Sequence, residues 1–420
     1  MDKVFKKVIA LVLVCVIGLE MSGCGIMETG QTGGVNGTDR EYVESSGSER
    51  ETEAAEQREI ETAGQDTDLQ ADGHEMADSA VQNMRIGWNL GNSLDATGSW
   101  IMQYTEGNVE SFETAWGNPV TPPTLMQKLK SSGFDSVRIP ITWNYHFDEE
   151  GNIDAKWMAR VKEIVDWAME ADLYCIINIH HDTGSDGWLR ASKANYDENS
   201  QVFKKLWEQI SAEFRDYPDL LLFEGFNEML DENAEWSNPN AEAVEVINWY
   251  NQLFVDTVRS TGGNNAERNL ICCTYAAATT GSVLDGFRLP EDSVQGHLLA
   301  EIHFYLPYEF ITDEGVTWTT PLKEYTDYVE QQIDEVFLRL SERFAAENVP
   351  LIVGEFACDD KDNTAERIKW YTHVIEKANE INATCFIWDN GNGFSMGHID
   401  RVGDEDSFPQ IIEACVETAK

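Results

Sequence analysis

The chain has 420 residues, and its 30 Lys and Arg residues are outnumbered by 75 Asp and Glu residues, which gives a formal net charge of −45. A polyanion of this size repels nucleic-acid phosphates and anionic lipid headgroups, which argues against a nucleic-acid-binding function. The charge is compatible with a neutral polymer such as a polysaccharide. The 13 Trp residues fit such a partner, because flat aromatic faces are good platforms for sugar rings.

Residues 1–24 have the pattern of a signal peptide, in which lysines near the start precede an apolar run at residues 8–19. This run is too short to span a bilayer. It is followed by Met21-Ser22-Gly23-Cys24, which resembles a bacterial lipoprotein processing site. We therefore expect Cys24 to carry lipid, with ordinary signal cleavage as the alternative. The protein is then secreted or anchored to the outer face of the bacterial cell membrane, and the membrane is a partner only through this lipid.

Residues 25–80 are rich in Gly, Ser, Thr, Glu, Gln and Asp and contain few large apolar residues. Such a segment buries too little apolar surface to offset its chain entropy, so a disordered acidic linker is predicted. Residues 81–420 are predicted to form one catalytic domain, which we expect to be a monomer. The cysteines show neither a disulfide framework nor the spacing of a zinc site.

Eight short apolar runs follow, separated by amphipathic or turn-rich stretches, and continuous apolar runs suit parallel strands that are covered on both faces. The alternation predicts an α/β fold, a (β/α)₈ TIM barrel. An open doubly wound sheet is the alternative, but residues 87–92 lack the GxGxxG pattern that such a sheet would carry after its first strand. The runs are residues 84–90, 134–140, 173–180, 220–226, 270–275, 297–305, 349–356 and 383–388.

Active sites of such barrels gather at the carboxyl ends of the strands. Six of the eight runs end in polar, ionisable or flat aromatic residues, and this convergence predicts a site at that face. The residues concerned are Arg138, His180-His181-Asp182, Asn227-Glu228, His303-Phe304-Tyr305, Glu355 and Trp388-Asp389-Asn390.

Glu228 and Glu355 are the candidate catalytic pair. They lie 127 residues apart (355 minus 228), which at about 40 residues per βα unit corresponds to strands four and seven, nearly opposite each other across the barrel. Retaining glycosidases need two carboxyl groups about 5–5.5 Å apart, one as nucleophile and one as acid/base. The alternative for each residue alone is a structural ion pair at a strand end.

The neighbouring residues supply what this chemistry requires. Arg138 and the Tyr305 hydroxyl are expected to keep a nucleophilic Glu355 ionised. Partial burial favours the proton that an acid at Glu228 must hold. Asn227 has an amide that can bind a sugar 2-hydroxyl, and Trp388 can stack under the sugar ring.

Seven segments, in order and with fitting spacing, resemble glycoside hydrolase family 5 over about residues 81–420. They are Gly87-Trp88-Asn89-Leu90-Gly91-Asn92-Ser93-Leu94-Asp95-Ala96, Arg138-Ile139-Pro140, Ile179-His180-His181-Asp182, Gly225-Phe226-Asn227-Glu228-Met229, Glu301-Ile302-His303-Phe304-Tyr305, Val353-Gly354-Glu355-Phe356 and Phe386-Ile387-Trp388-Asp389-Asn390.

The resemblance implies a (β/α)₈ barrel and retaining hydrolysis by double displacement without a cofactor. It implies that Glu228 is the acid/base and Glu355 the nucleophile. The other active-site positions that it implies are Arg138, His180, Asn227, His303, Tyr305 and Trp388, with His181 and Asn92 as substrate contacts. The opening segment and the His-His-Asp run are most similar to the branch that holds endoglucanases, lichenan-degrading enzymes and xyloglucanases.

A metal site at His180 and His181 is not expected, because adjacent residues of a strand point to opposite sides and the run lacks zinc spacing. Trp116 and Trp143 are each interpreted either as a sugar platform or as a cap of the barrel. The expected function is an endo-β-1,4-glucanase acting on cellulose or a related β-glucan. Xyloglucanase, lichenase, mannanase or xylanase activity on the same scaffold, and a non-enzymatic surface glycan-binding protein, are the alternatives.

Overall fold

The computed structural model describes residues 74–184, 187–312, 319–391 and 393–420. The predicted signal peptide, Cys24 and most of the predicted linker lie outside these residues. Within the described ranges, none of the helices combines the length and the apolar character that a membrane span requires.

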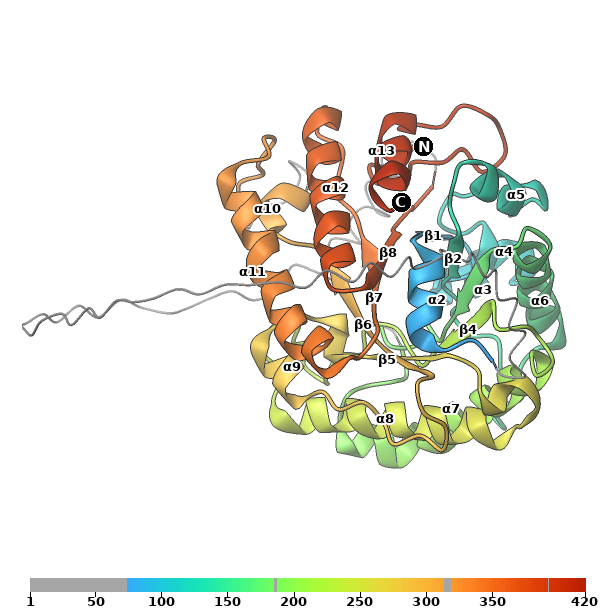
Figure 1. The fold of residues 1–420 in the computed structure, drawn as a ribbon. Coiled ribbons are helices and arrows are strands. Elements are labelled where there is room, and N and C mark those ends of the chain that lie inside the picture. The colour runs from blue at the N-terminus through green and yellow to red at the C-terminus, as the bar shows by residue number, and fades with distance from the viewer. Residues whose placement is uncertain (1–73, 185–186, 313–318, 392) are drawn as a thin grey trace, which may run out of the picture. The chain divides into compact units, whose positions relative to one another are not determined.

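Eight parallel strands close into a barrel in which each strand pairs with its neighbours in chain order and β8 returns to β1 (Figure 1). Every strand lies inside one of the eight predicted runs, so the predicted (β/α)₈ barrel is confirmed. The strands are β1 Ile86–Asn89, β2 Ser136–Ile139, β3 Tyr174–Ile177, β4 Leu221–Glu224, β5 Leu270–Cys273, β6 Leu298–Phe304, β7 Leu351–Phe356 and β8 Ala383–Ile387.

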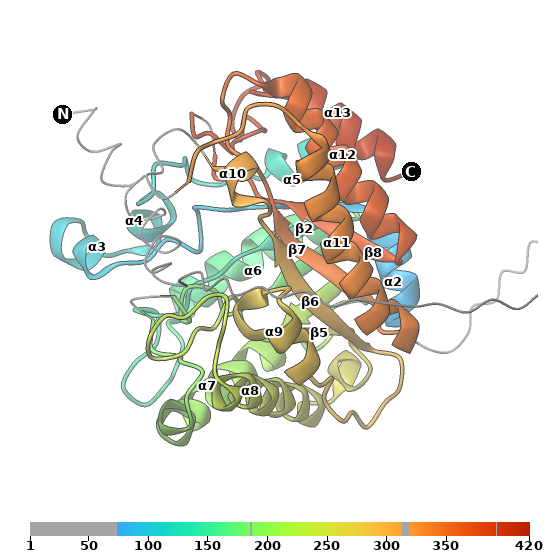
Figure 2. The same ribbon diagram turned by 90° about the vertical axis from the view of Figure 1, so that its left-hand side faces the viewer.

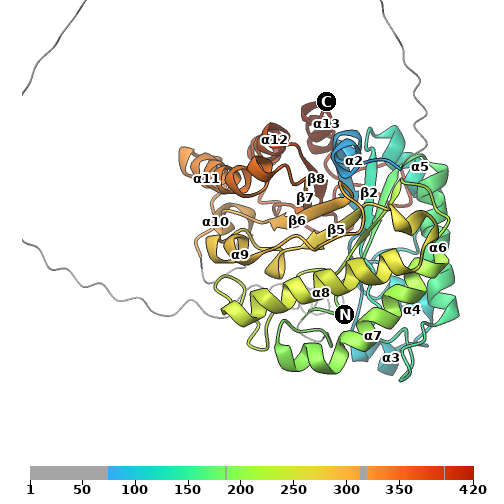
Figure 3. The same cartoon turned by 60° about the horizontal axis from the view of Figure 1, so that its bottom comes forward.

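The longer helices surround the barrel, with α7 and α8 side by side along one flank (Figure 3). The α-helices of the described residues, long and short, are α2 Ala77–Met84, α3 Ser99–Tyr104, α4 Val109–Glu113, α5 Thr124–Ser131, α6 Ala155–Glu170, α7 Lys193–Glu213, α8 Ala241–Ser260, α9 Gly281–Gly286, α10 Tyr308–Ile311, α11 Asp327–Arg343, α12 Thr364–Glu380 and α13 Pro409–Thr418. Three 3₁₀ turns are described at Gly263–Ala266, Tyr275–Ala277 and Ala345–Glu347.

The interior of the barrel is layered, because residues at i and i+2 of a strand face the same side. The lowest layer is apolar and includes Leu222 of β4 and Leu299 of β6. Two residues further along the same strands come Glu224 and Glu301, both fully buried. The interior therefore changes from apolar to polar toward the carboxyl ends of the strands, where the candidate site residues lie.

Helix α2 closes the amino-terminal end of the barrel. Its buried residues Ala77, Ala80, Val81 and Met84 pack against the apolar layer, and they recur at the i, i+3, i+4, i+7 spacing of one helix face. The helix starts at Ala77, so the residues that pack on the barrel begin a few positions before the predicted boundary at residue 80. Figure 2 shows α2 on the opposite side of the barrel from α3, which stands in the loop after β1.

Candidate active site

The two predicted carboxylates meet above the polar layer. Glu228 follows β4, Glu355 lies in β7, and their nearest oxygens are within 4.8 Å of each other. The side chain of Glu228 is 22% exposed and that of Glu355 is 7% exposed. The pair is therefore close enough for the retaining arrangement, with one carboxyl group open to solvent and the other enclosed.

The sheet register is irregular where Glu355 lies. Val353 pairs with Ile302 and Glu355 pairs with His303, so Gly354 is an extra residue between two matched positions. Such an irregularity re-aims the side chains that follow it. The nucleophile candidate consequently faces the barrel interior beside His303 instead of continuing the simple alternation of β7.

Glu355 is held by donors on both of its oxygens. Arg138 Nη1 donates to Oε1 at 2.8 Å, and the Tyr305 hydroxyl donates to Oε2 at 2.9 Å. Burial raises the pKa of Glu355, while the positive charges of His303 and Arg138 oppose that rise. These contacts are the ones expected for a carboxylate that must stay ionised and point at its target.

His303 stands between the two carboxylates. Its Nδ1 lies 2.7 Å from Glu228 Oε1 and 3.6 Å from Glu355 Oε2. Burial alone would lower the pKa of His303, but Glu355, Glu228 and Glu301 together raise it to about 10. A pKa this high favours the doubly protonated ring at neutral pH, in which Nδ1 donates to Glu228 Oε1.

Arg138 is fully buried and uses its whole guanidinium. It binds Glu224 through Nε at 2.6 Å and Nη2 at 2.8 Å, and Nη2 also donates to Asn227 Oδ1 at 3.0 Å. Burial alone would lower the pKa of Arg138, but the surrounding carboxylates raise it well above its usual value. Because the Asn227 oxygen is occupied by Arg138, its amide NH₂ group is left to donate to a substrate hydroxyl.

His180 is neutral and oriented. Burial, followed by the charges of His181, Arg138 and His303, holds its pKa well below the usual value. The Asn178 amide nitrogen lies 3.0 Å from Nδ1, and Asn178 Oδ1 accepts from the Ile141 amide, which fixes the side-chain orientation. The proton of the ring is thus on Nε2, which lies 3.9 Å from Glu355 Oε1.

The expectation that His180 and His181 point to opposite sides is wrong. Strand β3 ends at Ile177, so the alternation of a regular strand does not extend to these residues, and the two rings lie 4.4 Å apart between centroids. His181 also faces Trp116 at 5.3 Å, and its Nε2 is 3.7 Å from Asp95 Oδ2. His181 and Trp116 thus form one side of the site together with His180.

Trp388 follows β8 and lies parallel to the His180 ring, 6.0 Å away at 5° between planes. A Cβ at Gly91 would come within 2.8 Å of Trp388 Cζ2, so the glycine makes room for the indole. Trp143, in contrast, is fully buried and donates from Nε1 to the Asn178 carbonyl. Trp143 is therefore a structural residue that supports the loop after β2.

Asn92 is a predicted site residue that makes no direct contact with Glu228 or Glu355 among the described contacts. It has a φ of 58° and is 1% exposed. Its backbone amide donates to Asp95 and its carbonyl accepts from Asn118. Its Oδ1 has no hydrogen-bond partner among the described residues.

Glu224 and Glu301 belong to the site but were missed in the analysis of the sequence. The signal for Glu301 was present, because Glu301, His303 and Tyr305 alternate with the apolar Ile302 and Phe304 and therefore share one face of the strand. Glu224 follows three apolar residues and precedes Gly225, so polar and apolar residues do not alternate around it.

Three clusters in the described residues have metal-ligand side chains close together: first Glu228 with His303 and Glu355, second Asp95 with His180 and His181, and third Glu224 with Cys273 and Glu301. An imidazolium has no lone pair to offer a metal, so His303 is a poor ligand in the first cluster. In the second, Asp95 accepts from the backbone amides of Asn92 and Ser93. The absence of a metal stays a prediction.

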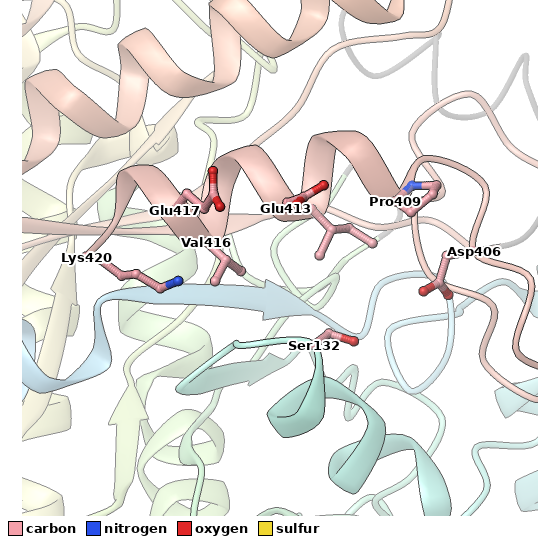
Figure 4. A pocket seen from close by; sticks show the side chains of 8 residues that line it. Ser132, Asp406, Pro409, Glu413, Val416, Glu417 and Lys420 are labelled. Carbon is pink, nitrogen blue, oxygen red and sulfur yellow. The ribbon is translucent and has the colours of Figure 1, made fainter.

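A separate hollow of about 450 Å³ lies between α13 and the end of α5 (Figure 4). Its lining includes Ser132, Asp406, Glu413, Val416 and Lys420. It contains none of the predicted site residues.

The six described cysteines are all buried and free.

Comparison with known proteins places these features in one family. The family model for cellulase (glycosyl hydrolase family 5) matches residues 94–394. Endoglucanase B of Neocallimastix patriciarum is 36% identical over 345 residues, which cover 80% of this chain and 70% of that protein. Endoglucanase A of Clostridium longisporum is 35% identical over 364 residues, which cover 84% of this chain and 68% of that protein.

Solved structures of similar proteins point to the same family. A family 5 enzyme of Prevotella bryantii, bound to a xyloglucan tetradecasaccharide, has a TM-score of 0.75 and 39% identity over 83% of this chain and 99% of that one. A broad-specificity endoglucanase of Ruminococcus champanellensis with bound cellotriose has a TM-score of 0.76 and 36% identity, over 82% of this chain and 99% of that one. The chain belongs to glycosyl hydrolase family 5.

Proposed function

We propose that this protein is a retaining endo-β-1,4-glucanase that cleaves internal bonds of cellulose or a related β-glucan. The observation that carries the proposal is the pair Glu228 and Glu355, whose nearest oxygens lie within 4.8 Å with His303 against both. Inverting enzymes need carboxyl groups about 6.5–9.5 Å apart to hold a water between them, which this pair does not provide.

In the first step, a Glu355 oxygen attacks the anomeric carbon and forms the glycosyl–enzyme bond. The bond from that carbon to the leaving-group oxygen breaks, and the proton of Glu228 passes to that oxygen. In the second step, Glu228 takes a proton from a water, the water oxygen attacks the same carbon, and Glu355 leaves as a carboxylate. Two inversions give net retention.

The surrounding residues support this sequence of steps. Arg138 and Tyr305 each donate to one oxygen of Glu355 and so aim the carboxylate. The free amide group of Asn227 suits the 2-hydroxyl, where a hydrogen bond strengthens in the transition state. Trp388 supplies an aromatic face, and His180 offers Nε2–H as a donor.

The choice among β-glucans is left open by the relatives. The structural neighbours include a xyloglucan-specific endo-β-1,4-glucanase at 32% identity and a lichenase of Caldicellulosiruptor at 33% identity. We propose that the enzyme acts outside the cell, either secreted or held by lipid on Cys24, because of the signal-peptide pattern of residues 1–24. A monomer stays the expected oligomeric state.

The test is reducing-sugar release and viscosity across carboxymethylcellulose, lichenan, xyloglucan, mannan and xylan. Fast loss of viscosity with little sugar released from a β-1,4-glucan is the expected result, since internal cuts shorten chains quickly. Cleavage of mannan or xylan alone would move the protein to another activity of the scaffold. Folded protein inactive on every polymer would instead favour a glycan-binding role.

A further inference from the structure

Glu301 is a buried carboxylate that the two-step mechanism does not use. It lies on β6 inside the barrel and is fully buried. Its Oε1 is 3.4 Å from His303 Nε2 and 3.6 Å from Arg138 Nε, without a hydrogen-bond partner among the described residues. Burial and the charge of Glu224 raise the pKa of Glu301, and the charges of Arg138 and His303 oppose that rise and favour the ionised form.

The remaining oxygen is poorly compensated. Cys273 Sγ lies 3.3 Å from Glu301 Oε2 but only 2.7 Å from the Phe226 carbonyl, and a thiol has a single proton to donate. Burial raises the pKa of Cys273 well above its usual value, so the thiol keeps that proton. Glu301 therefore depends chiefly on His303 and Arg138.

The backbone makes room for this carboxylate beside the nucleophile. A Cβ at Gly354 would lie 1.7 Å from Glu301 Oε1, so any other residue there would displace the Glu301 side chain. Gly354 is also the extra residue in the register between β6 and β7. The irregularity that aims Glu355 thus also creates the chamber for Glu301.

His303 connects this chamber to the acid/base candidate. Its Nδ1 faces Glu228 Oε1 at 2.7 Å, and its Nε2 faces Glu301 Oε1 at 3.4 Å. A neutral imidazole has one donor nitrogen and one acceptor nitrogen, so it can satisfy an acceptor on only one side. Carboxylates on both sides favour the ring that carries two protons.

We propose that Glu301 is a positioning residue that keeps His303 doubly protonated and aimed at Glu228, and so sets the alkaline limit of activity. This inference rests on the proposed acid/base role of Glu228. The titratable or charged groups that face Glu301 and His303 are Arg138 from β2, His180 after β3, Glu224 and Glu228 from β4 and its end, Cys273 from β5, Tyr305 after β6 and Glu355 from β7.

The direction of the effect follows from charge. Removing a negative charge lowers the proton affinity of every group that feels it. In Glu301→Gln, His303 and Glu228 should each lose a proton at lower pH than in the wild type. The alkaline limb of kcat/KM should therefore move to lower pH by about one unit. Glu301→Asp keeps the charge and should keep the limb near its wild-type position.

The experiment compares pH profiles on a soluble β-glucan for wild type, Glu301→Gln, Glu301→Asp and Cys273→Ala, all checked for folding. Cys273→Ala disturbs the chamber without changing its charge, so its alkaline limb should not move. An alkaline limb of Glu301→Gln that coincides with that of the wild type would overturn the inference, because Glu301 would then be neutral and structural.

A second measurement needs no substitution. In ¹⁵N-imidazole NMR, both nitrogens of His303 should be protonated at about pH 8, as the pKa near 10 requires. A singly protonated ring at that pH would also overturn the inference. If the wild type were inactive on all β-glucans, the proposed function would fail, while the His303 spectrum of Glu301→Gln compared with that of the wild type would still report on Glu301.

Discussion

The guanidinium of Arg138 binds the carboxylate of Glu224 through two nitrogens, Nε at 2.6 Å and Nη2 at 2.8 Å. This fork fixes the guanidinium plane, because both bonds must be made at once. The third nitrogen, Nη1, is thereby directed at Glu355 at 2.8 Å. A buried ion pair below the site thus determines where the donor to Glu355, the proposed nucleophile, points.

Arg138→Lys should lower kcat at least about 100-fold, since an ammonium cannot donate to Glu224 and Glu355 in this planar arrangement. Initial rates on a soluble β-glucan measure the effect. Arg259→Lys is the matched control, because Arg259 binds Asp292 by a similar fork away from the site. If both variants lost kcat equally, the loss would reflect general destabilisation instead of a role at Glu355.

Glu355→Gly should reduce turnover by about 10⁴-fold or more, because the covalent step loses its nucleophile. Azide should restore cleavage of an activated β-aryl glycoside by attacking from the vacated side, and the product should be the α-glycosyl azide. The configuration is read by NMR. A β-glycosyl azide from this variant would contradict the assignment.

Glu228→Ala should spare substrates with good leaving groups and lose polymer hydrolysis, because only poor leaving groups need a proton from the acid. The comparison is kcat/KM for a dinitrophenyl cellobioside against a β-glucan. With azide, the intact nucleophile should yield the β-glycosyl azide. Equal losses on both substrates would rule out the acid role.

Met84→Ala should lower the free energy of unfolding by about 2–5 kcal/mol, because it leaves a cavity where α2 packs on the apolar layer. Gln82→Ala, on the exposed face of the same helix, should change it by less than about 0.5 kcal/mol. Urea unfolding measures both. Equal, small effects would mean that α2 is dispensable to the barrel.

The burial of His146 predicts that the folded protein loses stability in acid. Its ring stacks on Trp157 at 3.6 Å, and burial lowers its pKa to about 3, with Asp154 opposing the fall. The unfolded chain takes up a proton near the usual His pKa of about 6.5, so the stabilisation is complete above that value and is lost as pH falls toward 3.

Between pH 7 and pH 5, the wild type should therefore lose about 2 kcal/mol more than His146→Phe, which keeps a ring on Trp157 without a titrating group. Urea unfolding at the two pH values gives the difference. Parallel losses in the two proteins would show that His146 is not protonated on unfolding in this range.

The barrel was predictable because parallel strands covered on both faces leave continuous apolar runs, and all eight strands lie inside such runs. Helix α7 was harder. It begins at Lys193, where its first turns are polar and are started by the Ser192 cap, so an apolar pattern does not mark its beginning. Helix α2 was missed because its eight residues follow a long polar segment.

At the site, the strand ends predicted the residues that meet at Glu228 and Glu355, because the fold brings those ends together. The layer beneath was less accessible to sequence reasoning. The pairing of Arg138 with Glu224 depends on which residues of β2 and β4 share a level of the barrel, and one chain alone does not show that register. The neighbouring rings of His180 and His181 depend on where β3 stops.

The residues just before α2 are fixed to the amino-terminal end of the barrel. The Glu75 amide donates to Asp219 and the Glu75 carbonyl accepts from Asn269, both of which lie just before a strand begins. The chain thus enters the domain at the end remote from Glu228 and Glu355. Chain that enters at this closed end leaves the carboxyl ends of the strands, with Glu228 and Glu355, free of the segment that leads into the domain.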